Sequence, residues 1–155
     1  MLILPLNDQH DRQGFDCGSP VLNGWFQQMA RQHKSKGISS TFVVVADKAG
    51  TEVYGFYSLS FAEIINVDLP VKIGKKLPVK VPVFRLGRLA TSEHHKRQGI
   101  GKMMVADAFL RVKQLADHVG GIGLMVNAKP EAVVFYRQYG FEQMRDHPLN
   151  LFMPF

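Results

Sequence analysis

The stretch RLATSEHHKRQGIGK, from Arg88 to Lys102, carries the strongest structural signal in this sequence. A strand-like run leads into a polar loop that contains Gly99 and Gly101, and a helix pattern follows at once. Glycine lets the backbone approach a ligand closely, and the first turn of a helix offers unpaired amides and the positive end of its dipole. The pattern therefore predicts a cradle for phosphate groups. It is neither the dinucleotide fingerprint, which has a third glycine, nor a P-loop, which needs Ser or Thr after its lysine.

The hydrophobic pattern around this stretch predicts alternating helices and strands. Ser19 and Pro20 begin a first helix with a basic tail, which ends at Gly37. The helix after the cradle has an apolar stripe at Val105, Phe109, Val112, Leu115 or Ala116, and Val119. The other expected elements are strands at 41–46, 52–65, 83–91 and 122–127, an extended basic loop at 66–82, a polar loop at 92–99, helices at 100–119 and 130–139, and a strand pair or long strand at 141–154. This order predicts an α/β fold, a mixed sheet flanked by helices, in a single domain spanning residues 1–155.

Length and composition limit the class of protein. The 155 residues fit one domain, and 46% hydrophobic with 21% charged residues is typical of a globular chain rather than a disordered one. The apolar runs are far shorter than the roughly 18 residues of a membrane span. The N-terminus also lacks the basic flank and long apolar core of a signal peptide. We therefore expect a cytoplasmic protein without a membrane partner.

The charge balance favours polyanionic partners. Nineteen Lys and Arg against thirteen Asp and Glu give a net charge of +6 at pH 7, and such a field attracts phosphate-rich molecules. Cys17 is the only cysteine, which excludes an intrachain disulfide, and the six histidines lack HExxH spacing, so no metal is expected. Cys17, His94 and His95 are interpreted as structural or solvated residues.

The segment 83–141 resembles the GNAT N-acetyltransferase superfamily. The resemblance rests on the strand LGRLAT, the loop HHKRQGIGK, the strand LMVNA and the motif VVFYRQYGF. In that family the glycine loop reads Gln/Arg-x-x-Gly-x-Gly/Ala and binds the pyrophosphate of acetyl-CoA. Here Lys96 takes its first position, which keeps a positive charge but loses the guanidinium fork. The resemblance implies acetyl-CoA as co-substrate and a splayed strand pair that binds the CoA arm.

The remaining sequence narrows the resemblance to one group within the superfamily. FDCGSPVLNGWF (15–26), LPVKIGKKLPVKVP (69–82) and VFRLGRLAT (83–91) are similar to GNAT toxins of toxin–antitoxin pairs, and the similarity covers nearly the whole chain. Such toxins acetylate the α-amino group of aminoacyl-tRNA, which blocks translation, and a ribbon-helix-helix antitoxin holds them inactive. The resemblance thus implies aminoacyl-tRNA and such an antitoxin as partners, and leaves a homodimer open.

The resemblance also implies a general acid. Tyr136 of the FY motif would protonate the departing CoA thiolate, because the ordinary pKa values of a thiol and a phenol, about 8.5 and 10, are close enough for transfer within a hydrogen bond. The alternative is that Phe135 and Tyr136 only pack the short helix onto the sheet. Tyr139 is interpreted as structural.

Further residues would bind the cofactor. The backbone of Leu89, Ala90 and Thr91 would pair with the pantetheine arm and polarise the acetyl carbonyl. Asn127 would bond the same arm, unless it is merely a turn residue that ends its strand. Phe135 would line the arm as a side wall. The phosphate cradle comprises Lys96, Arg97, Gln98, Gly99, Ile100, Gly101 and Lys102.

Two observations bear on the acceptor. The strand Val83–Thr91 contains no carboxylate that could serve as a general base. An α-amino group, with a pKa of about 7.7–8.0, needs such a base less than a lysine side chain does. A basic face for tRNA phosphates is expected from Arg85, Arg88, Lys72, Lys75, Lys76 and Lys80, although a solvated surface ladder would show the same pattern.

Other functions stay open at this point. An acetyltransferase of a small amine or of a protein N-terminus would need the same cradle and the same tyrosine. A non-catalytic acyl-CoA-binding or RNA-binding module is disfavoured, because Tyr136 and the cradle are both intact.

Overall fold

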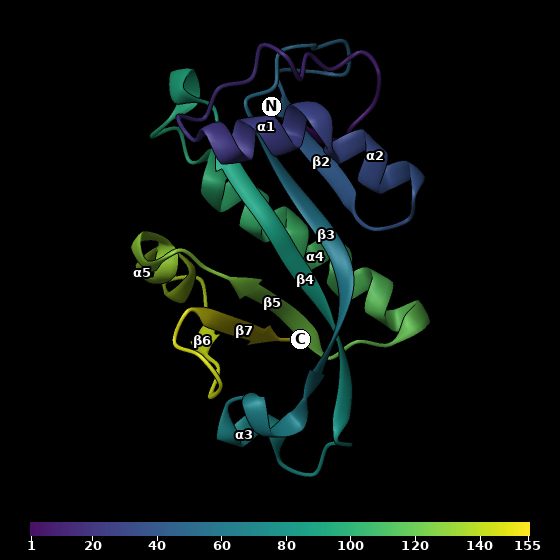
Figure 1. Ribbon diagram of the computed structural model, residues 1–155, viewed down its shortest axis with the longest axis vertical. Helices are drawn as coiled ribbons and strands as arrows, with labels where there is room; N and C mark the ends of the chain where they lie inside the picture. The colour runs from purple at the N-terminus through teal and green to yellow at the C-terminus, as the bar shows by residue number, and fades with distance from the viewer. The chain divides into compact units, whose positions relative to one another are not determined.

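The computed structural model describes residues 1–155 and contains seven strands (Figure 1). They are hydrogen-bonded in the order β1-β2-β3-β4-β5-β7-β6. β4 and β5 are parallel, whereas β1 with β2, β2 with β3, β5 with β7 and β6 with β7 are antiparallel. The bounds are β1 (Leu2–Pro5), β2 (Ser40–Val45), β3 (Gly55–Ile65), β4 (Lys80–Thr91), β5 (Gly123–Asn127), β6 (Glu142–Gln143) and β7 (Asn150–Pro154). The predicted α/β fold with a mixed sheet is confirmed.

The helices that the sequence pattern predicts are present, although several of their bounds differ from the prediction. Ser19 caps the first helix, since its side chain accepts a hydrogen bond from the Leu22 amide. The bounds are α1 (Pro20–Gln28), α2 (Ala30–Ser35), α3 (Val71–Gly74), α4 (Ile100–Val119) and α5 (Val133–Arg137), with short 3₁₀ turns at 66–68, 93–95 and 130–132. None of these helices combines the length and hydrophobicity needed to cross a bilayer.

The chain divides into two compact units, each with its own core. Unit 1 comprises residues 1–60 and 87–108, and unit 2 comprises residues 61–86 and 109–155. β3, β4 and α4 contribute residues to both units. Each unit is described by itself below.

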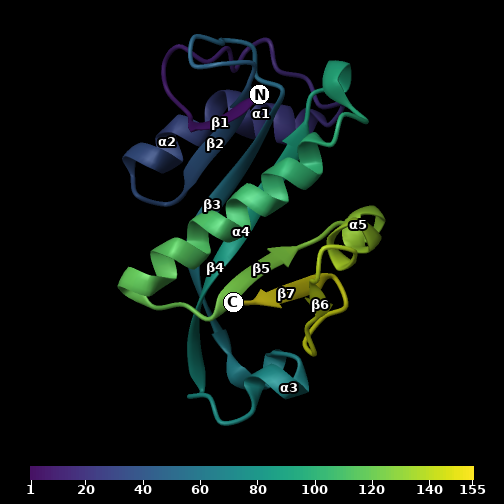
Figure 2. The same cartoon turned by 180° about the vertical axis from the view of Figure 1, so that it is seen from behind.

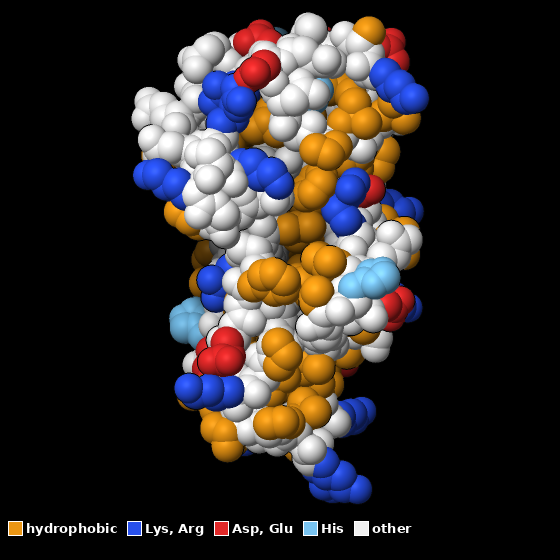
Figure 3. Space-filling model, turned by 90° about the vertical axis from the view of Figure 1, so that its right-hand side faces the viewer, with side chains coloured by type: hydrophobic (Ala, Val, Ile, Leu, Met, Phe, Trp, Pro, Cys, Tyr) orange, Lys and Arg blue, Asp and Glu red, His pale blue; other side chains and the backbone are white.

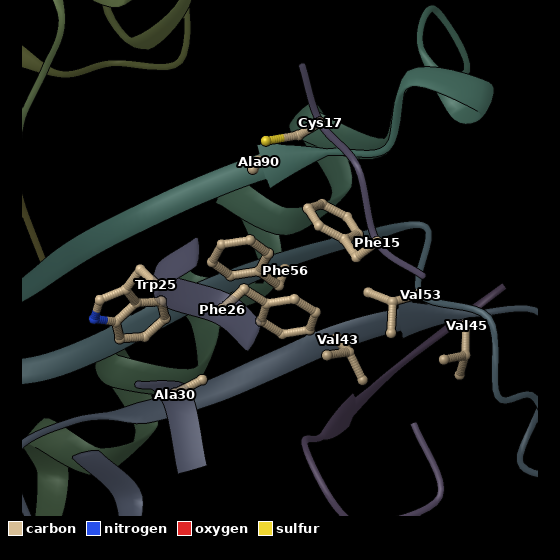
Figure 4. Close-up of a cluster of buried hydrophobic side chains, with 10 residues drawn as sticks. All are labelled: Phe15, Cys17, Trp25, Phe26, Ala30, Val43, Val45, Val53, Phe56 and Ala90. Carbon is tan, nitrogen blue, oxygen red and sulfur yellow. The ribbon is translucent and has the colours of Figure 1, made fainter. Parts of the chain in front are cut away.

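Unit 1 has helices on both faces of its strands. α1 and α2 lie over one face (Figure 1), and the first half of α4 lies over the other (Figure 2). The alternation of β2 directs Val43 and Val45 toward the α1 face, where they join an aromatic core (Figure 4). In that core the Phe26 ring stacks on Phe56, with centroids 4.3 Å apart. This packing fixes α1 against β2 and β3.

Unit 2 is built around β5, whose residues from Gly123 to Val126 are all buried. Its core comprises Leu69, Val83, Met125, Met144 and Phe152. β5 pairs with β4 through Phe84–Leu124, Arg85–Met125 and Leu86–Val126, and with β7 on its other side. The splay between β4 and β5 that the resemblance implies concerns residues of both units and stays a prediction.

The structure corrects the predicted elements at the N-terminal side. The sequence analysis missed the edge strand β1. The first helix, expected to run to Gly37, breaks at Met29, which has φ −111° and separates α1 from α2. Ala30 directly after the break is fully buried in the core beside Phe26. Core packing therefore outweighs the continuous helical pattern.

The basic segment 66–82 is not only an extended loop. Pro70 accepts hydrogen bonds from the amides of Ile73 and Gly74, which closes α3, and Leu69 is buried beneath it. β4 begins at Lys80 and includes Pro82. Proline has no N–H to donate, but its carbonyl accepts a hydrogen bond from the Ile122 amide, so Pro82 is tolerated within the strand.

The apolar stripe predicted for α4 holds only in its first part. Val105 and Val112 are buried, together with Ile100, Met104 and Ala108. Phe109 and Ala116, the alternative to Leu115, are half-buried, whereas Leu115 and Val119 are 42% and 58% exposed. The last turns of α4 thus extend beyond the part of the helix that covers the core.

Candidate functional site

The loop before α4 is anchored within unit 1 at its first residues. The amide of Ser92 donates to the Tyr54 carbonyl at 2.8 Å, and the amide of Glu93 donates to the Asp16 carbonyl at 2.8 Å. The Ser92 hydroxyl accepts a hydrogen bond from the His94 amide. Residues 96–99 beyond these anchors are exposed. A fixed start and an exposed end suit a loop that presents its backbone to a ligand.

The backbone of this loop turns sharply into α4. Arg97 and Gly99 both have left-handed φ values, 65° and 75°. A non-glycine residue in this region is uncommon and costs about 1 kcal/mol or more. A Cβ added to Gly99 would meet no atom within 4 Å, so the space in front of this residue is open.

The first turn of α4 supplies the anion-binding groups. The amide of Met103 donates to the Gly99 carbonyl at 3.0 Å, as in the first hydrogen bond of a helix. The amides of Ile100, Gly101 and Lys102 therefore have no acceptor within the helix, and the positive end of the helix dipole lies beside them. This geometry matches a phosphate cradle.

The cations of the cradle are not equivalent. Lys96 donates to the Glu93 carboxylate at 2.7 Å, so its charge is largely compensated. Arg97 and Lys102 are exposed and form no ion pair within the protein. Both are free to meet a phosphate, whereas Lys96 would first have to leave its exposed ion pair with Glu93.

The strand residues before the loop lie at the edge of the unit 1 core. Ala90 is buried among the core residues labelled in Figure 4, and Leu89 and Thr91 are half-buried. Their side chains pack as expected, which leaves their backbone groups for the role that the resemblance implies.

Tyr136 is buried in unit 2. Its ring lies against Phe135 and Phe141 in edge-on contacts, with centroids 5.1 and 5.4 Å apart. Burial of the phenol raises the pKa of Tyr136 to about 12. The hydroxyl therefore stays protonated at neutral pH, as a general acid requires.

The raised pKa also corrects the premise of a close match with the thiol. A free thiol at about 8.5 lies about 3.5 pKa units below Tyr136, which corresponds to about 5 kcal/mol against complete transfer. A thiolate that leaves in an equally water-poor environment has a raised pKa too, because desolvation disfavours its charge. Tyr136 is thus suited to donate a hydrogen bond to sulfur while charge develops.

Asn127, at the end of β5, has a structural partner. Its side-chain amide donates to Asn150 at 2.6 Å, and Asn150 in turn donates to Asp146 at 3.1 Å. Asn127 is exposed and its side-chain carbonyl is not used in these bonds. Phe135 is half-buried between Tyr136 and Tyr139.

The six residues of the expected basic face fall in different environments. In unit 1, the Arg88 guanidinium lies 4.1 Å from the centroid of Trp25, and burial lowers the pKa of Arg88. In unit 2, Arg85 is half-buried, and its Nε is enclosed without a hydrogen-bond partner. The exposed members are Lys72, Lys75, Lys76 and Lys80, around α3.

The structure therefore gathers the predicted residues in two groups. Leu89–Thr91 and 96–102 belong to unit 1, with Arg88. Asn127, Phe135 and Tyr136 belong to unit 2, with Arg85 and the four lysines. No group of three or more His, Cys, Asp or Glu side chains is arranged to hold a metal ion.

The sequence analysis missed the residues that anchor the cradle. Asp16 accepts hydrogen bonds from the Gly18 amide and the Asn23 side chain, which lowers the pKa of its carboxyl. Gly18 has φ +86° and its Cα faces the Glu93 carboxylate, so a side chain there would displace Glu93. The signal was the Asp-x-Gly spacing within FDCGS, a turn pattern.

Comparison with known proteins decides the family. The family model described as Acetyltransferase (GNAT) domain matches residues 8–150. The chain belongs to the GNAT acetyltransferases. This confirms the resemblance drawn from the cradle and the FY motif.

Individual GNAT relatives resemble the chain over nearly its full length. A tRNA-acetylating toxin of Mycobacterium tuberculosis (strain ATCC 25618 / H37Rv) is 32% identical over 149 residues, which cover 96% of this chain and 88% of the toxin. The structure of AtaT complexed with acetyl-methionyl-tRNAfMet superimposes with a TM-score of 0.90 at 32% identity, covering 99% of this chain and 94% of AtaT. A tyrosine-to-phenylalanine mutant of AtaT, bound to the C-terminus of the antitoxin AtaR and acetyl-CoA, gives a TM-score of 0.81 at 29% identity, with 99% and 92% coverage. The chain is thus a GNAT acetyltransferase related to tRNA-acetylating toxins.

Proposed function

We propose that this protein transfers the acetyl group of acetyl-CoA to the α-amino group of aminoacyl-tRNA and thereby blocks translation, as the toxin of a toxin–antitoxin pair. The observation that carries the proposal is the full-length similarity to a tRNA-acetylating toxin, together with the fold shared with AtaT. The match over 8–150 supports a single N-acetyltransferase domain over residues 1–155.

Acetyl-CoA would be held by its pyrophosphate at the start of α4. The amides of Ile100, Gly101 and Lys102, which have no acceptor within the helix, would donate to that anion, and Arg97 and Lys102 would add uncompensated charge. Gln98 and Gly99 complete the loop, and Lys96 pairs with Glu93. The backbone of Leu89, Ala90 and Thr91, with Asn127 and Phe135, would take the pantetheine arm. The assignment of residues from both units to one cofactor rests on the family.

The chemistry is a direct acyl transfer. The amine nitrogen attacks the thioester carbonyl, an N–C bond forms and the C–S bond breaks. The amine releases one proton to water, the departing sulfur takes one proton from Tyr136, and water returns a proton to the tyrosine, so the transfer balances. Tyr136, protonated because of its raised pKa, donates to the sulfur, and a backbone amide of Leu89 or Ala90 polarises the carbonyl oxygen.

The acceptor proposal agrees with the absence of a carboxylate in Val83–Thr91. An α-amino group with a pKa of about 7.7–8.0 is partly neutral at physiological pH and can attack without a strong base. The lysines around α3, with Arg85 and Arg88, would contact tRNA phosphates. Figure 3 shows Lys and Arg side chains beside hydrophobic ones at its lower end, where α3 lies.

The partner proposal follows from the relatives. AtaT binds the C-terminus of its antitoxin AtaR. By analogy this protein would be held inactive in the cytoplasm by an antitoxin, and we propose the ribbon-helix-helix class for it.

A translation assay tests this function. Addition of the protein with acetyl-CoA to a cell-free translation mixture should stop synthesis, and the Tyr136→Phe variant should not. Undiminished synthesis in the presence of active wild-type enzyme and acetyl-CoA would favour acetylation of a small amine or a protein N-terminus.

A further inference from the structure

Arg88 is a half-buried cation close to the backbone that would polarise the acetyl group. It lies two residues before Ala90 on β4, which corresponds to about 7 Å of extended chain. The cradle loop follows only after Thr91, where β4 ends. With the pyrophosphate of acetyl-CoA at the cradle and its acetyl group at Ala90, Arg88 would lie beyond the acetyl group, where the acceptor approaches.

The Arg88 guanidinium has no anionic partner within the protein. No carboxylate forms an ion pair with it, and its close contact is the face of Trp25, with Cζ 4.1 Å from the ring centroid. A ring face attracts the cation but leaves the N–H donors in the plane of the guanidinium without an acceptor. Arg88 is therefore able to receive an anionic ligand without giving up an ion pair.

Trp25 is a fixed platform for this guanidinium. Its ring stacks on Phe56, with centroids 6.0 Å apart and an interplanar angle of 20°, and the His33 ring meets it edge-on at 5.4 Å. Only 9% of Trp25 is exposed, and Figure 4 shows it at one end of the buried cluster of unit 1. A ring held on several sides limits the positions that the guanidinium above it can take.

Packing alone does not favour tryptophan at position 25. The indole N–H is buried without a hydrogen-bond partner, and the nitrogen lies on the side away from the other labelled side chains in Figure 4. An unsatisfied buried donor destabilises the fold, and a phenylalanine would avoid it. Tryptophan is, however, the aromatic residue that attracts cations most strongly. The residue type thus fits a platform for Arg88.

We propose that Trp25 is a positioning residue that holds the Arg88 guanidinium against the last internucleotide phosphate of aminoacyl-tRNA, an inference that rests on the proposed function. This phosphate precedes the terminal adenosine, and only the terminal ribose separates it from the ester of the amino acid. It is therefore the phosphate nearest to the reacting α-amino group. A guanidinium can bind it through two parallel N–H···O bonds, which a lysine ammonium cannot form.

Neutralisation of one phosphate tests this assignment. The two substrates are charged tRNA and charged tRNA whose last phosphodiester is replaced by an uncharged methylphosphonate. For each protein the readout is the ratio of kcat/KM for the two substrates, which we call the phosphate preference. A variant that is merely less folded or less active loses rate with both substrates, so its phosphate preference stays that of wild type. Melting temperature and acetyl-CoA titration are measured for each variant.

The assignment predicts a graded loss of the phosphate preference. Wild type should prefer the normal tRNA by about 10- to 100-fold, because a charge-assisted pair is lost with the neutral linkage. Arg88→Gln should abolish the preference, and Arg88→Lys should keep only a part of it, since the charge remains but the fork is lost. Trp25→Leu should lower the preference about three- to tenfold, and Trp25→Phe should lower it less.

Two further proteins separate positioning from other effects. Trp25→Leu combined with Arg88→Gln should match Arg88→Gln alone, because Trp25 acts through Arg88. Arg31→Gln removes a cation at an exposed position of unit 1 and should keep the wild-type preference.

The outcomes distinguish this inference from the function on which it rests. If wild type acetylates neither tRNA, the proposed function fails and the inference fails with it. If wild type acetylates both tRNAs with equal kcat/KM, or if Arg88→Gln keeps the full preference, the assignment alone is overturned. A preference lost in Arg88→Gln but fully kept in Trp25→Leu would contradict the positioning role of Trp25.

Discussion

Burial determines what Tyr136 can do. The aromatic contacts with Phe135 and Phe141 remove its phenol from water and raise the pKa of Tyr136 to about 12. At neutral pH the residue can donate a proton but cannot act as a base. A buried ring also packs the core of unit 2, whether or not its hydroxyl takes part in catalysis. Only removal of the hydroxyl with the ring kept separates proton donation from packing.

The variant Tyr136→Phe makes that separation. It keeps the ring and its contacts, so acetyl-CoA affinity and folding should be retained. The transfer rate should fall by about 10²–10⁴-fold, the usual cost of a lost general acid. Calorimetric titration with acetyl-CoA and measurement of kcat test both parts, and wild-type turnover would reduce Tyr136 to packing.

The raised pKa of Tyr136 also predicts how stability depends on pH. In the unfolded chain the phenol ionises near pH 10, whereas in the folded protein it ionises near 12. The folded state therefore holds this proton more tightly. Its contribution is complete below pH 10 and is lost as pH rises from 10 to 12, with a total of about 3 kcal/mol.

Urea unfolding of wild type and Tyr136→Phe between pH 8 and about 11.5 checks this sign. The wild type should lose more unfolding free energy than the variant across this range. Parallel curves would show that Tyr136 is not desolvated in solution.

At the scale of elements, the start of α4 is where sequence and structure agree best. The loop is anchored at Ser92 and Glu93, turns through Arg97 and Gly99, and presents the first amides of a long helix. An acidic residue in a first helical turn is compatible with the helix dipole and even stabilises it. Affinity for an anion and stability of the helix can thus be changed in opposite directions.

The variant Gly101→Asp should lower the affinity for an anion without lowering the stability of the helix. The new side chain and its negative charge would lie where the pyrophosphate approaches the amides, so acetyl-CoA binding should be lost while the melting temperature stays within a few degrees of wild type. Ala106→Asp, an equal charge change at an exposed position of the same helix, is the control and should bind normally. An unchanged titration with Gly101→Asp would contradict the cradle assignment.

Local patterns predicted the elements that depend on local physics. The cap at Ser19, the glycine loop before Ile100 and the buried run of β5 are all encoded within a few residues. The break at Met29 and the edge strand Leu2–Pro5 were missed, because both depend on partners distant in the sequence. Core burial of Ala30 decides the first, and pairing with β2 decides the second.

In the candidate site, too, the features carried by a local motif were predicted, and the pairings between distant residues were not. The glycine spacing and the family resemblance led to the proposed cradle and to Tyr136, but neither revealed that Glu93 pairs with Lys96 or that Arg88 stacks on Trp25. Such pairings arise only when the fold brings side chains together. The pKa of Tyr136 likewise depends on rings that surround it only after folding.

At the scale of the whole molecule, the net charge of +6 gives the protein a field suited to a polyanion. The exposed lysines around α3 are the best candidates for direct phosphate contacts. Arg85 is unsuitable for a charge-reversal test, because a glutamate at this half-buried position would place an unpaired carboxylate partly out of water and destabilise the fold.

Lys75→Glu therefore tests the basic face at an exposed position. It should weaken tRNA binding and lower the salt slope by roughly 0.7–0.9 per lost phosphate contact, without an effect on acetyl-CoA affinity. Lys48→Glu, the same charge reversal in unit 1, provides the comparison for the general effect of net charge. Equal effects of the two variants would show that net charge alone governs the binding.

The most direct test of the whole account is mass analysis of aminoacyl-tRNA after incubation with this protein and acetyl-CoA. The charged tRNA should carry one acetyl group on the α-nitrogen of its amino acid, and Tyr136→Phe should leave it unmodified over the same time. Unmodified aminoacyl-tRNA, beside an enzyme that releases CoA with small amines or peptide N-termini as acceptors, would contradict the account.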